Sequence, residues 1–303
     1  MQYRYALQQV GAKYPCPACH QKRFVRYIDT TTGSHLASHV GRCDREDSCA
    51  YHLTPSEYFK LQGNTTKAHH ATKPPEPKPE PELTTSYIDP EILQATLAQY
   101  NSNNFCRWLC SIFGQQQAFQ LTATYRIGTS KHWPGATIFW QIDQHHNIRS
   151  GKIMLYNPQT GKRIKDPFHI IWVHKALNIQ PFHLNQCLFG EHLLTTDPKK
   201  PVAIVESEKT AIIAAGFIPD SLWLATAGKG NLKPEKLKVL HQRQVKLYPD
   251  LGACEKWQTI AAGLPNITVS TISTILEKRA TPADRAQGLD LADYLLRENN
   301  LVF

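Results

Sequence analysis

The stretch VAIVESEKTA, residues 202–211, decides how the C-terminal part of this chain is interpreted. Its first four residues are apolar and three of them are β-branched, which is typical of a buried strand. The strand stops at Glu206, and Ser207-Glu208-Lys209 begins an expected helix. Two acids one residue apart at the end of a buried strand have two explanations. They mark a helix N-terminus, where the helix dipole favours acids, or they belong to a metal site.

From residue 201 onward, apolar strand-like runs alternate with helical patterns. Such alternation predicts a parallel sheet with helices packed on its faces, and function in these sheets collects at the carboxyl ends of the strands. The first helix is expected to close at Gly216. The expected strands are 201–206, 221–227, 245–250 and 266–272, and the expected helices are 208–216, 233–242, 253–263 and 289–299.

Four acids lie where this sheet would bring them together. Glu206 ends the first strand, Asp250 ends the third, and Asp290 and Asp293 stand at the start of the last helix. Clustered carboxylates repel one another unless a hard cation such as Mg²⁺ shares them, and such a cluster can stabilise charge on a transferring phosphoryl group. Glu208 has a simpler explanation as an acid in the first helical turn.

The composition indicates a polyanion partner and no membrane segment. The 303 residues carry a formal charge of +9, with a pI of about 9.1. The excess lies outside the C-terminal segment, which is nearly neutral. No apolar run approaches the ~20 residues of a membrane span, and the first fifteen residues lack the apolar core of a signal peptide. We therefore expect a cytoplasmic protein.

Composition shifts divide the chain into four segments. A small module occupies residues 1–63, and residues 64–83, rich in Pro, Glu and Lys, are expected to be an extended linker. Residues 84–200 are basic and mix a helical pattern, with Asp89 as its N-cap, with short β-like runs. Residues 201–303 hold the expected parallel sheet. The predicted fold is thus multidomain: a zinc ribbon, an α+β middle region and an α/β C-terminal domain.

Four cysteines in the first segment have the spacing of a zinc site. Cys16, Cys19, Cys43 and Cys49 form a Cys-x2-Cys-x23-Cys-x5-Cys pattern, which predicts two knuckles holding a tetrahedral Zn²⁺. The second spacing is wider than usual, so His52 and His20 stand as alternatives to Cys49 as the fourth ligand. A module of this size has little core, so the metal is expected to contribute to its folding.

Cationic and aromatic side chains alternate within this module. Arg23, Arg26 and Arg42 stand among Phe24 and Tyr27. This mixture suits contacts with a nucleic-acid backbone and stacking on bases. A solvated ribbon face with a few structural aromatics is the alternative.

The C-terminal motifs resemble those of a Toprim domain, the fold found in bacterial primases, topoisomerases and related nucleases. VESEKTA resembles the first Toprim motif, with Ser207 where glycine is usual, and GLDLADYL resembles the third. GKIMLYNPQTGKR followed by QCLFGEHLL resembles the stretch that precedes this domain in replicative primases. The order of zinc ribbon, basic region and Toprim domain is similar to a bacterial family often carried on mobile elements.

One position departs from the Toprim pattern. The second motif usually reads Asp-x-Asp, whereas this chain has Asp250-Leu251-Gly252. Glu255, one helical turn later, is a candidate substitute for the missing acid. Without such a substitute, one metal position is weakened or lost.

The resemblance implies a role for each candidate residue. Glu206 is implied to lie nearest the reacting phosphate, as metal ligand or general acid/base, while Asp250 and Asp290, with Asp293 as a further candidate, hold Mg²⁺ or Mn²⁺. The residues implied to contact nucleotide or nucleic-acid phosphates are Lys152, Lys162, Arg163, Lys165 and Lys209.

We therefore expect a DNA primase-like protein of a replication or mobilisation system. It would bind single-stranded DNA and nucleotides, act with a helicase, and attach ribonucleotides to a 3′ hydroxyl by Mg²⁺-dependent nucleotidyl transfer. The missing acid keeps two alternatives open, namely a catalytically inactive DNA-binding or adaptor protein and a Toprim nuclease.

Overall fold

The computed structural model describes residues 4–8, 13–45, 49–62, 84–228, 230–264 and 267–297. The chain divides into two compact units, residues 1–81 and 82–303. The predicted linker at 64–83 lies outside the described residues. Within the described ranges, no helix is long and apolar enough to cross a membrane.

The first unit is a small antiparallel sheet followed by one short helix. Its strands follow the order β1-β3-β4-β5, and β2 pairs with β3. Helix α1 (Pro55–Leu61) begins at a capping box in which Thr54 and Glu57 each accept a backbone N–H of the other. The strands are β1 (Tyr5–Leu7), β2 (Tyr14–Pro15), β3 (Lys22–Asp29), β4 (Gly41–Cys43) and β5 (His52–Leu53).

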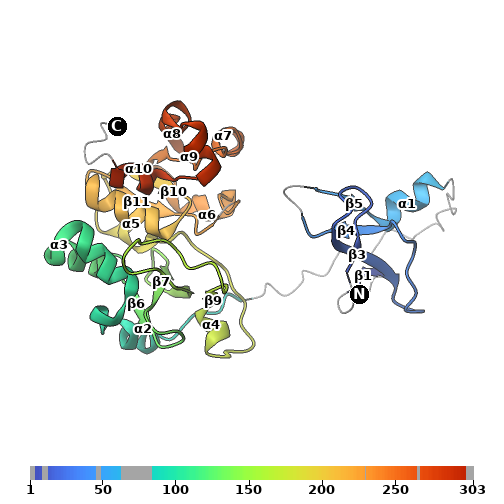
Figure 1. The fold of residues 1–303 in the computed structure, drawn as a ribbon, viewed down its shortest axis with the longest axis horizontal. Coiled ribbons are helices and arrows are strands. Elements are labelled where there is room, and N and C mark those ends of the chain that lie inside the picture. The colour runs from blue at the N-terminus through green and yellow to red at the C-terminus, as the bar shows by residue number, and fades with distance from the viewer. Residues whose placement is uncertain are drawn as a thin grey trace. The chain divides into compact units, whose positions relative to one another are not determined.

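The second unit begins with an antiparallel sheet, drawn in the lower half of that unit in Figure 1. Its strands pair in chain order, β6-β7-β8-β9. All seven residues of β7 are buried, so both faces of this strand are covered. The elements are β6 (Gly128–Ser130), β7 (Ala136–Ile142), β8 (Ile148–Met154), β9 (Ile170–Trp172), and the helices α2 (Pro90–Thr96) and α4 (Val173–Ala176).

The helical pattern that begins at Asp89 is divided between two helices. Asp89 caps α2 as expected, and its carboxylate accepts the N–H of Glu91 at 2.8 Å. A short 3-10 turn, η1 (Tyr100–Ser102), then leads into α3 (Asn104–Thr124), which is interrupted at Gly114 with φ of 73°. A residue with positive φ cannot continue a right-handed helix, and glycine adopts it without steric cost.

The C-terminal sheet is parallel, as the alternating pattern predicts. Its order is β11-β10-β12-β13, and each neighbouring pair is parallel. The strands are β10 (Val202–Val205), β11 (Leu222–Ala225), β12 (Gln244–Leu247) and β13 (Thr268–Ile272). The helices are α5 (Glu208–Phe217), α6 (Pro234–Leu237), α7 (Cys254–Ala262), α8 (Ile275–Arg279), α9 (Pro282–Gln287) and α10 (Leu291–Arg297), with 3-10 turns η2 (Glu191–Thr195) and η3 (Lys238–Leu240).

Two details of the expected helices differ from the structure. Helix α5 does not end at Gly216 but continues to Phe217, because Gly216 does not adopt the positive φ of a C-terminal glycine cap. A Cβ at this position would lie 2.5 Å from the Phe113 ring, so the glycine also permits a close contact there. The helix expected at 233–242 is only four residues long before it tightens into η3.

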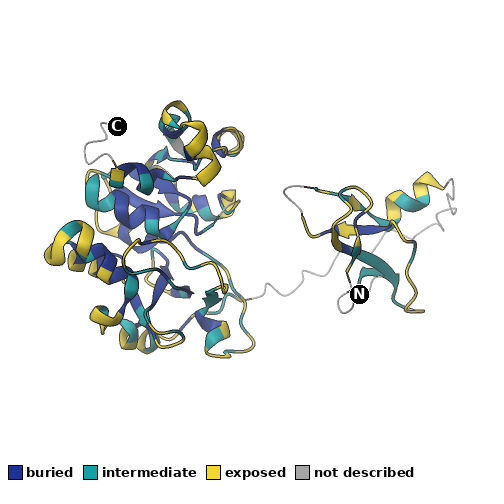
Figure 2. Cartoon of the chain, in the orientation of Figure 1, coloured by how far each residue is buried: buried dark blue, intermediate teal, exposed yellow. Residues whose placement is uncertain are grey.

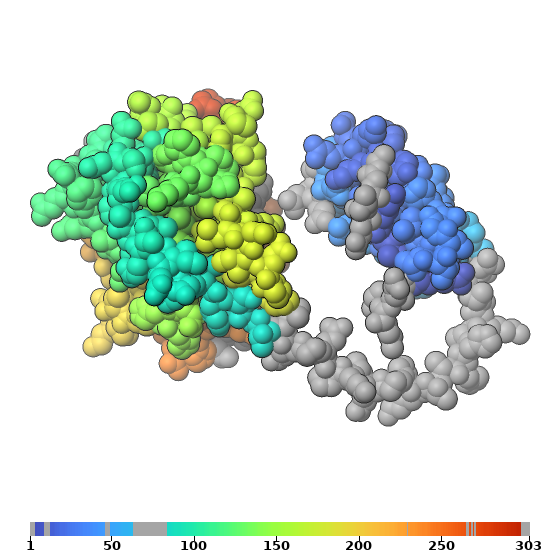
Figure 3. Space-filling model, turned by 90° about the horizontal axis from the view of Figure 1, so that it is seen from below, coloured from blue at the N-terminus to red at the C-terminus, as the bar shows by residue number. Residues whose placement is uncertain are grey.

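The two sheets of the second unit share one hydrophobic core. Phe139 of β7 and Met154 of β8 belong to the same buried cluster as the strands β10, β11 and β12. A second, smaller cluster contains Trp140 and covers the other face of the antiparallel sheet. Figure 2 shows this buried centre, and Figure 3 shows that residues of the antiparallel half cover one face of the unit. The middle segment and the parallel sheet therefore form one body, a question that the sequence leaves open.

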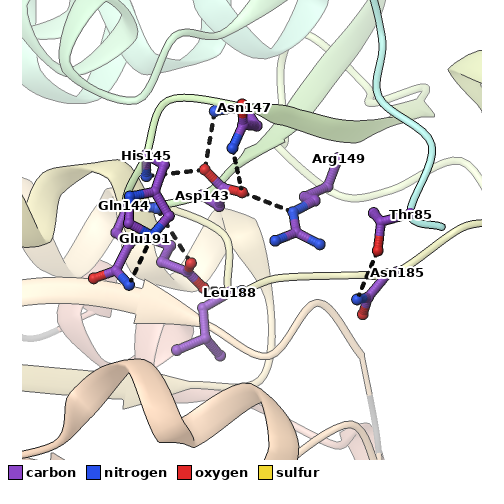
Figure 4. A network of polar contacts seen from close by, with 9 residues as sticks. All are labelled: Thr85, Asp143, Gln144, His145, Asn147, Arg149, Asn185, Leu188 and Glu191. Carbon is purple, nitrogen blue, oxygen red and sulfur yellow. Dashed lines mark hydrogen bonds and ion pairs between the residues drawn. The ribbon is translucent and has the colours of Figure 1, made fainter. Parts of the chain in front are cut away.

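A polar network around the buried acids Asp143 and Glu191 connects the turn between β7 and β8 with the segment before η2 (Figure 4). Asp143 accepts the backbone N–H groups of His145 and Asn147, each at 2.9 Å, and the Nε of Arg149 at 2.8 Å. Next to it, the Glu191 carboxylate accepts the N–H groups of Gln144 and Leu188. The hydrogen bonds of these two acids to backbone N–H groups stabilise the turns around them.

Asn103 is the side chain whose removal we expect to destabilise the second unit most clearly. It is fully buried, accepts the N–H groups of Phe105 and Cys106 at the start of α3, accepts the Thr137 hydroxyl at 2.7 Å, and donates to the Gly128 carbonyl at 3.0 Å. Asn103→Ala should lower the free energy of unfolding by about 2–4 kcal/mol, since a cap is lost and buried groups lose their partners.

Urea unfolding followed by tryptophan fluorescence measures this loss, because all six tryptophans lie in the second unit: Trp108, Trp133, Trp140, Trp172, Trp223 and Trp257. Asn101→Ala, at an exposed position of η1, is the control and should change little. A loss for Asn103→Ala no larger than for the control would contradict this account.

Candidate functional site

The four cysteines of the first unit converge on one point. The ligand atoms of Cys16, Cys19, Cys43 and Cys49 all lie within 4.8 Å of one another. The Sγ atoms of Cys16 and Cys49 are 3.7 Å apart, and those of Cys19 and Cys43 are 3.9 Å apart. Four thiolates at about 2.3 Å from a tetrahedral zinc ion lie about 3.8 Å from one another, so the cluster fits Zn²⁺.

The geometry favours Cys49 over the two alternative ligands, His52 and His20. His52 stacks on Tyr27, and its Nε2 lies 3.0 Å from the Tyr27 hydroxyl. The backbone N–H of His20 donates to the Cys16 carbonyl, which places His20 in the first knuckle turn. Neither imidazole belongs to the cluster of candidate ligands, whereas Cys49 does.

The three arginines expected to bind nucleic acid occupy different environments in the first unit. Arg23 and Arg42 are exposed on β3 and β4. Arg26 is half-buried, and its guanidinium lies over the Tyr14 ring at 3.7 Å from the centroid. Two of these side chains are thus accessible to a ligand, and the third is already engaged by an aromatic ring.

In the second unit, the predicted site residues meet in one pocket of about 670 Å³ at the carboxyl edge of the parallel sheet. Glu206 follows β10 and Asp250 follows β12, which is its direct neighbour in the sheet. The loop before α10 supplies the remaining acids. The predicted residues that line the pocket are Glu206, Asp250, Asp290, Asp293, Lys152, Lys162, Arg163, Lys165 and Lys209.

Hydrogen bonds fix the acids of the last loop, and one of them reaches the start of α5. Ser207 caps α5 by accepting the N–H of Thr210, and the Thr210 hydroxyl donates to Asp290 at 2.8 Å. The carboxylates of Asp290 and Asp293 each accept the other's backbone N–H at 3.1 Å. Thr210 is the residue that sequence reasoning missed. Its signal was the Ser-x-x-Thr spacing at the helix start.

Burial makes Asp290 harder to ionise than an exposed acid. Desolvation raises the pKa of its carboxyl, and the nearby Asp293 carboxylate raises it further, while Lys209 and the Thr210 hydroxyl act in the opposite direction. A cation bound at this position would favour the ionised form. Cation binding through Asp290 should therefore weaken as the pH falls toward that raised pKa.

The basic residues reach the pocket from a tight turn that follows β8. Asn157 forms this turn by accepting the N–H groups of Gln159 and Thr160 with its side chain, and Gly161 closes it with φ of 61°. A Cβ at Gly161 would lie 2.0 Å from the Trp108 indole, so the turn packs flat against that ring. The side chains that follow, Lys162, Arg163 and Lys165, are exposed at the pocket.

Two other lysines of the pocket are already paired. Lys152 Nζ lies 2.5 Å from the Glu208 carboxylate, and both side chains are buried. Lys209 Nζ lies 3.8 Å from Asp293 and 5.4 Å from the centre of the Trp108 ring. Glu208 is therefore more than a first-turn acid, because it neutralises a lysine from the other sheet.

The carboxylates of the pocket are less tightly gathered than the thiols of the ribbon. Among the described residues, only the four cysteines bring three or more candidate metal-ligand atoms close together, and the acids of the pocket do not. Mg²⁺ commonly keeps several waters and uses about one or two carboxylates, so a looser arrangement of acids suits it better than it would suit zinc. Glu255, the candidate substitute for the missing acid, is exposed and does not line the pocket.

Two parts of the chain match known families. Residues 3–64 match a zinc beta-ribbon finger family. Residues 103–251 match a family described as a domain of unknown function, DUF6371. No curated protein sequence matches the chain. The first match and the convergent thiols together support a structural zinc ion in the first unit.

Several solved structures are similar to this chain at low identity. The primase fragment of the bacteriophage T7 primase-helicase protein is 13% identical, with 94% of this chain and 98% of that chain covered and a TM-score of 0.39. The DnaG primase catalytic domain bound to ssDNA is 13% identical, with 68% and 82% covered and a TM-score of 0.42. A DNA primase domain from Pseudomonas aeruginosa is 16% identical, with 63% and 65% covered and a TM-score of 0.33. At these scores the activity has to be inferred from the residues of this chain.

Zinc content distinguishes Cys49 from His52 as the fourth ligand. The wild-type protein is expected to contain one zinc ion per chain, Cys49→Ser to lose it after dialysis against a mild chelator, and His52→Ala to keep it. Atomic absorption of the dialysed proteins provides the measurement. Zinc retention by Cys49→Ser together with zinc loss by His52→Ala would show that the histidine is the ligand.

Proposed function

We propose that this chain is a primase-like nucleotidyltransferase and that the pocket at the carboxyl edge of the parallel sheet is its active site. One observation carries the proposal: five carboxylates and five cationic side chains, including every residue predicted for the site in this unit, line the same pocket. A pocket that offers oxygen ligands beside phosphate-binding cations suits phosphoryl transfer. In this proposal the parallel sheet with its acids is a Toprim-like domain.

The acids divide by position. Glu206 and Asp250 leave adjacent strands, and Asp290 faces them from the loop before α10. We assign them to Mg²⁺ or Mn²⁺ binding, with Glu206 nearest the reacting phosphate and Asp293 in support. The cation would neutralise charge that develops on the phosphoryl group during transfer. In the reaction, a 3′ hydroxyl oxygen would bond to the α-phosphorus of a nucleoside triphosphate, the bond from that phosphorus to the pyrophosphate oxygen would break, and the hydroxyl proton would pass to a base such as Glu206 or to water.

The cationic side chains supply the other half of the proposal. Lys162, Arg163 and Lys165 are exposed at the pocket and would hold the triphosphate or the template backbone. In the zinc-ribbon unit, Arg23 and Arg42 would contact single-stranded DNA, and Arg26 with Tyr14 would offer a stacking surface for a base.

A primer-synthesis assay on single-stranded DNA with Mg²⁺ and ribonucleotides tests the catalytic assignment. Glu206→Gln and Asp250→Asn should each lower product formation by about 100-fold or more, because each removes charge that stabilises the transition state. Asp220→Asn, at an exposed acid outside the pocket, is the control. No product from the wild-type protein, or equal product from Glu206→Gln, would sink the catalytic claim. Cleavage of the DNA instead would favour a Toprim nuclease.

A specific observation favours the second candidate function, a nucleic-acid-binding protein without catalysis. Gly252 stands where a second acid is usual in the resembling motif, and its backbone N–H donates to the Glu277 carboxylate at 2.6 Å. Glu277 is in turn held by Arg285 at 2.6 Å. Such a protein would bind single-stranded DNA in a zinc-dependent, salt-sensitive way and would not respond to Mg²⁺.

Gly252→Asp tests whether the missing acid limits the site. Gly252 has φ of 77°, and a Cβ added there meets no atom within 4 Å, so the new carboxylate has space although the backbone is strained. If the pocket binds Mg²⁺, this variant should bind it more tightly, which isothermal titration measures. Gly252→Ala imposes a similar backbone cost without the charge and is the matched control. Equal Mg²⁺ affinities of the two variants would contradict a metal position beside residue 252.

A further inference from the structure

Lys152 differs from the other cations of the pocket in its surroundings. It lies in the middle of β8, opposite Phe139 of β7 and Trp172 of β9, and is 9% exposed. Lys162, Arg163 and Lys165, by contrast, are exposed. A buried ammonium needs a charged or strongly polar partner, whereas an exposed one is free to meet an incoming phosphate.

The partners of Lys152 come from two separate elements of the parallel half. Its Nζ lies 2.5 Å from the Glu208 carboxylate in the first turn of α5 and donates to the Ala227 carbonyl at 2.7 Å, in the loop after β11. Glu208 itself is 3% exposed. One side chain of the antiparallel sheet therefore ties together two segments that border the pocket.

These contacts lead directly to the backbone of Glu206. The residue after Ala227 is Gly228, and its N–H donates to the Glu206 carbonyl at 3.1 Å. Glu208 is two residues after Glu206, on the other side of the same turn. Lys152 thus restrains the segment that carries Glu206 through two contacts, one with Glu208 and one with the loop that contains Ala227 and Gly228.

A second lysine, Lys236, forms hydrogen bonds with uncharged groups of the same loop and of Gln186. Lys236 Nζ donates to the Gln186 side chain at 2.8 Å and to the Thr226 carbonyl at 3.4 Å. The carbonyls of two consecutive residues, Thr226 and Ala227, are therefore each held by a buried or half-buried lysine. These ammonium groups add to the backbone bonds from Thr226 to Val205 and from Gly228 to Glu206 that hold the loop, and Lys152 also forms an ion pair with Glu208.

We propose that Lys152 is a positioning residue: its ion pair with Glu208 and its bond to Ala227 hold Glu206 in place, and its ammonium does not bind nucleotide phosphate. This inference rests on the proposed function, because Glu206 would act in the proposed nucleotidyl transfer. With Glu208 neutralised by Lys152, the cation ligands remain Glu206, Asp250 and Asp290. Phosphate binding is left to the exposed residues Lys162, Arg163 and Lys165.

A thermal double-mutant cycle on the zinc-loaded full chain tests the pair itself. The variants are Lys152→Met, Glu208→Gln and the double variant, with unfolding followed by tryptophan fluorescence. Lys152→Met leaves a buried carboxylate unpaired, so removing that charge as well should raise the unfolding temperature above that of Lys152→Met alone. Additive losses of the two single variants would overturn the proposal.

Steady-state kinetics then separate positioning from phosphate binding. Lys152→Met should lower kcat at least about 10-fold and change KM for the nucleotide by less than about 3-fold, whereas Lys165→Met should mainly raise KM. Lys175→Met, an exposed lysine on α4 outside the pocket, is the control. A large rise in KM for Lys152→Met with unchanged kcat would overturn the proposal, because it would mean direct phosphate contact.

The outcomes distinguish a failure of the proposed function from a failure of the positioning role of Lys152. If the wild-type protein makes no primers, the proposed function falls, and the thermal cycle still decides whether Lys152 and Glu208 act as a unit. If primers form but the cycle is additive, the proposed function stands and the positioning role of Lys152 falls.

Discussion

The hydrophobic core that the two sheets of the second unit share is the constraint on which the pocket depends. Phe139 and Met154 of the antiparallel sheet pack in the same buried cluster as the strands of the parallel sheet. Because an unpaired charge is costly to bury in such a core, the acids Glu206 and Asp250 stand where their strands leave it, and the lysine within β8, Lys152, is paired with Glu208. The carboxyl edge of β10 and β12 is such a place, and the turn after β8 reaches it from the other sheet.

The charged side chains at this edge fall into two groups, buried charges and exposed charges. Buried charges are paired inside the protein, as Lys152 and Glu208 are, and serve to hold backbone segments. Exposed charges such as Lys162 and Arg163 form no ion pair with another described residue and are accessible to a ligand. The same pocket thus contains charged groups that stabilise its structure and charged groups that would bind a ligand. The two kinds differ in burial, although both include lysines.

Local sequence patterns predicted the architecture well where they reflect short-range physics. Strand and helix periodicity predicted the parallel sheet, and strand ends identified Glu206 and Asp250 as neighbours. Pairings between distant segments, such as Lys152 with Glu208, leave no local signal, because neither residue's neighbours encode the partner. The packing reason for Gly216 inside α5 likewise comes from a distant ring, that of Phe113, and helix-ending rules cannot anticipate it.

The contact between Gly161 and Trp108 has a consequence for how this pocket can change over time. One face of the indole receives the turn that carries the basic residues, and Lys209 lies within reach of the same ring. Exposed cations can be exchanged, added or lost with little effect on the fold, so ligand preference is free to drift. The glycine and the indole have no such freedom, since any side chain at 161 would displace the turn. The position of the basic turn therefore depends on two residues that carry no charge and that do not themselves line the pocket.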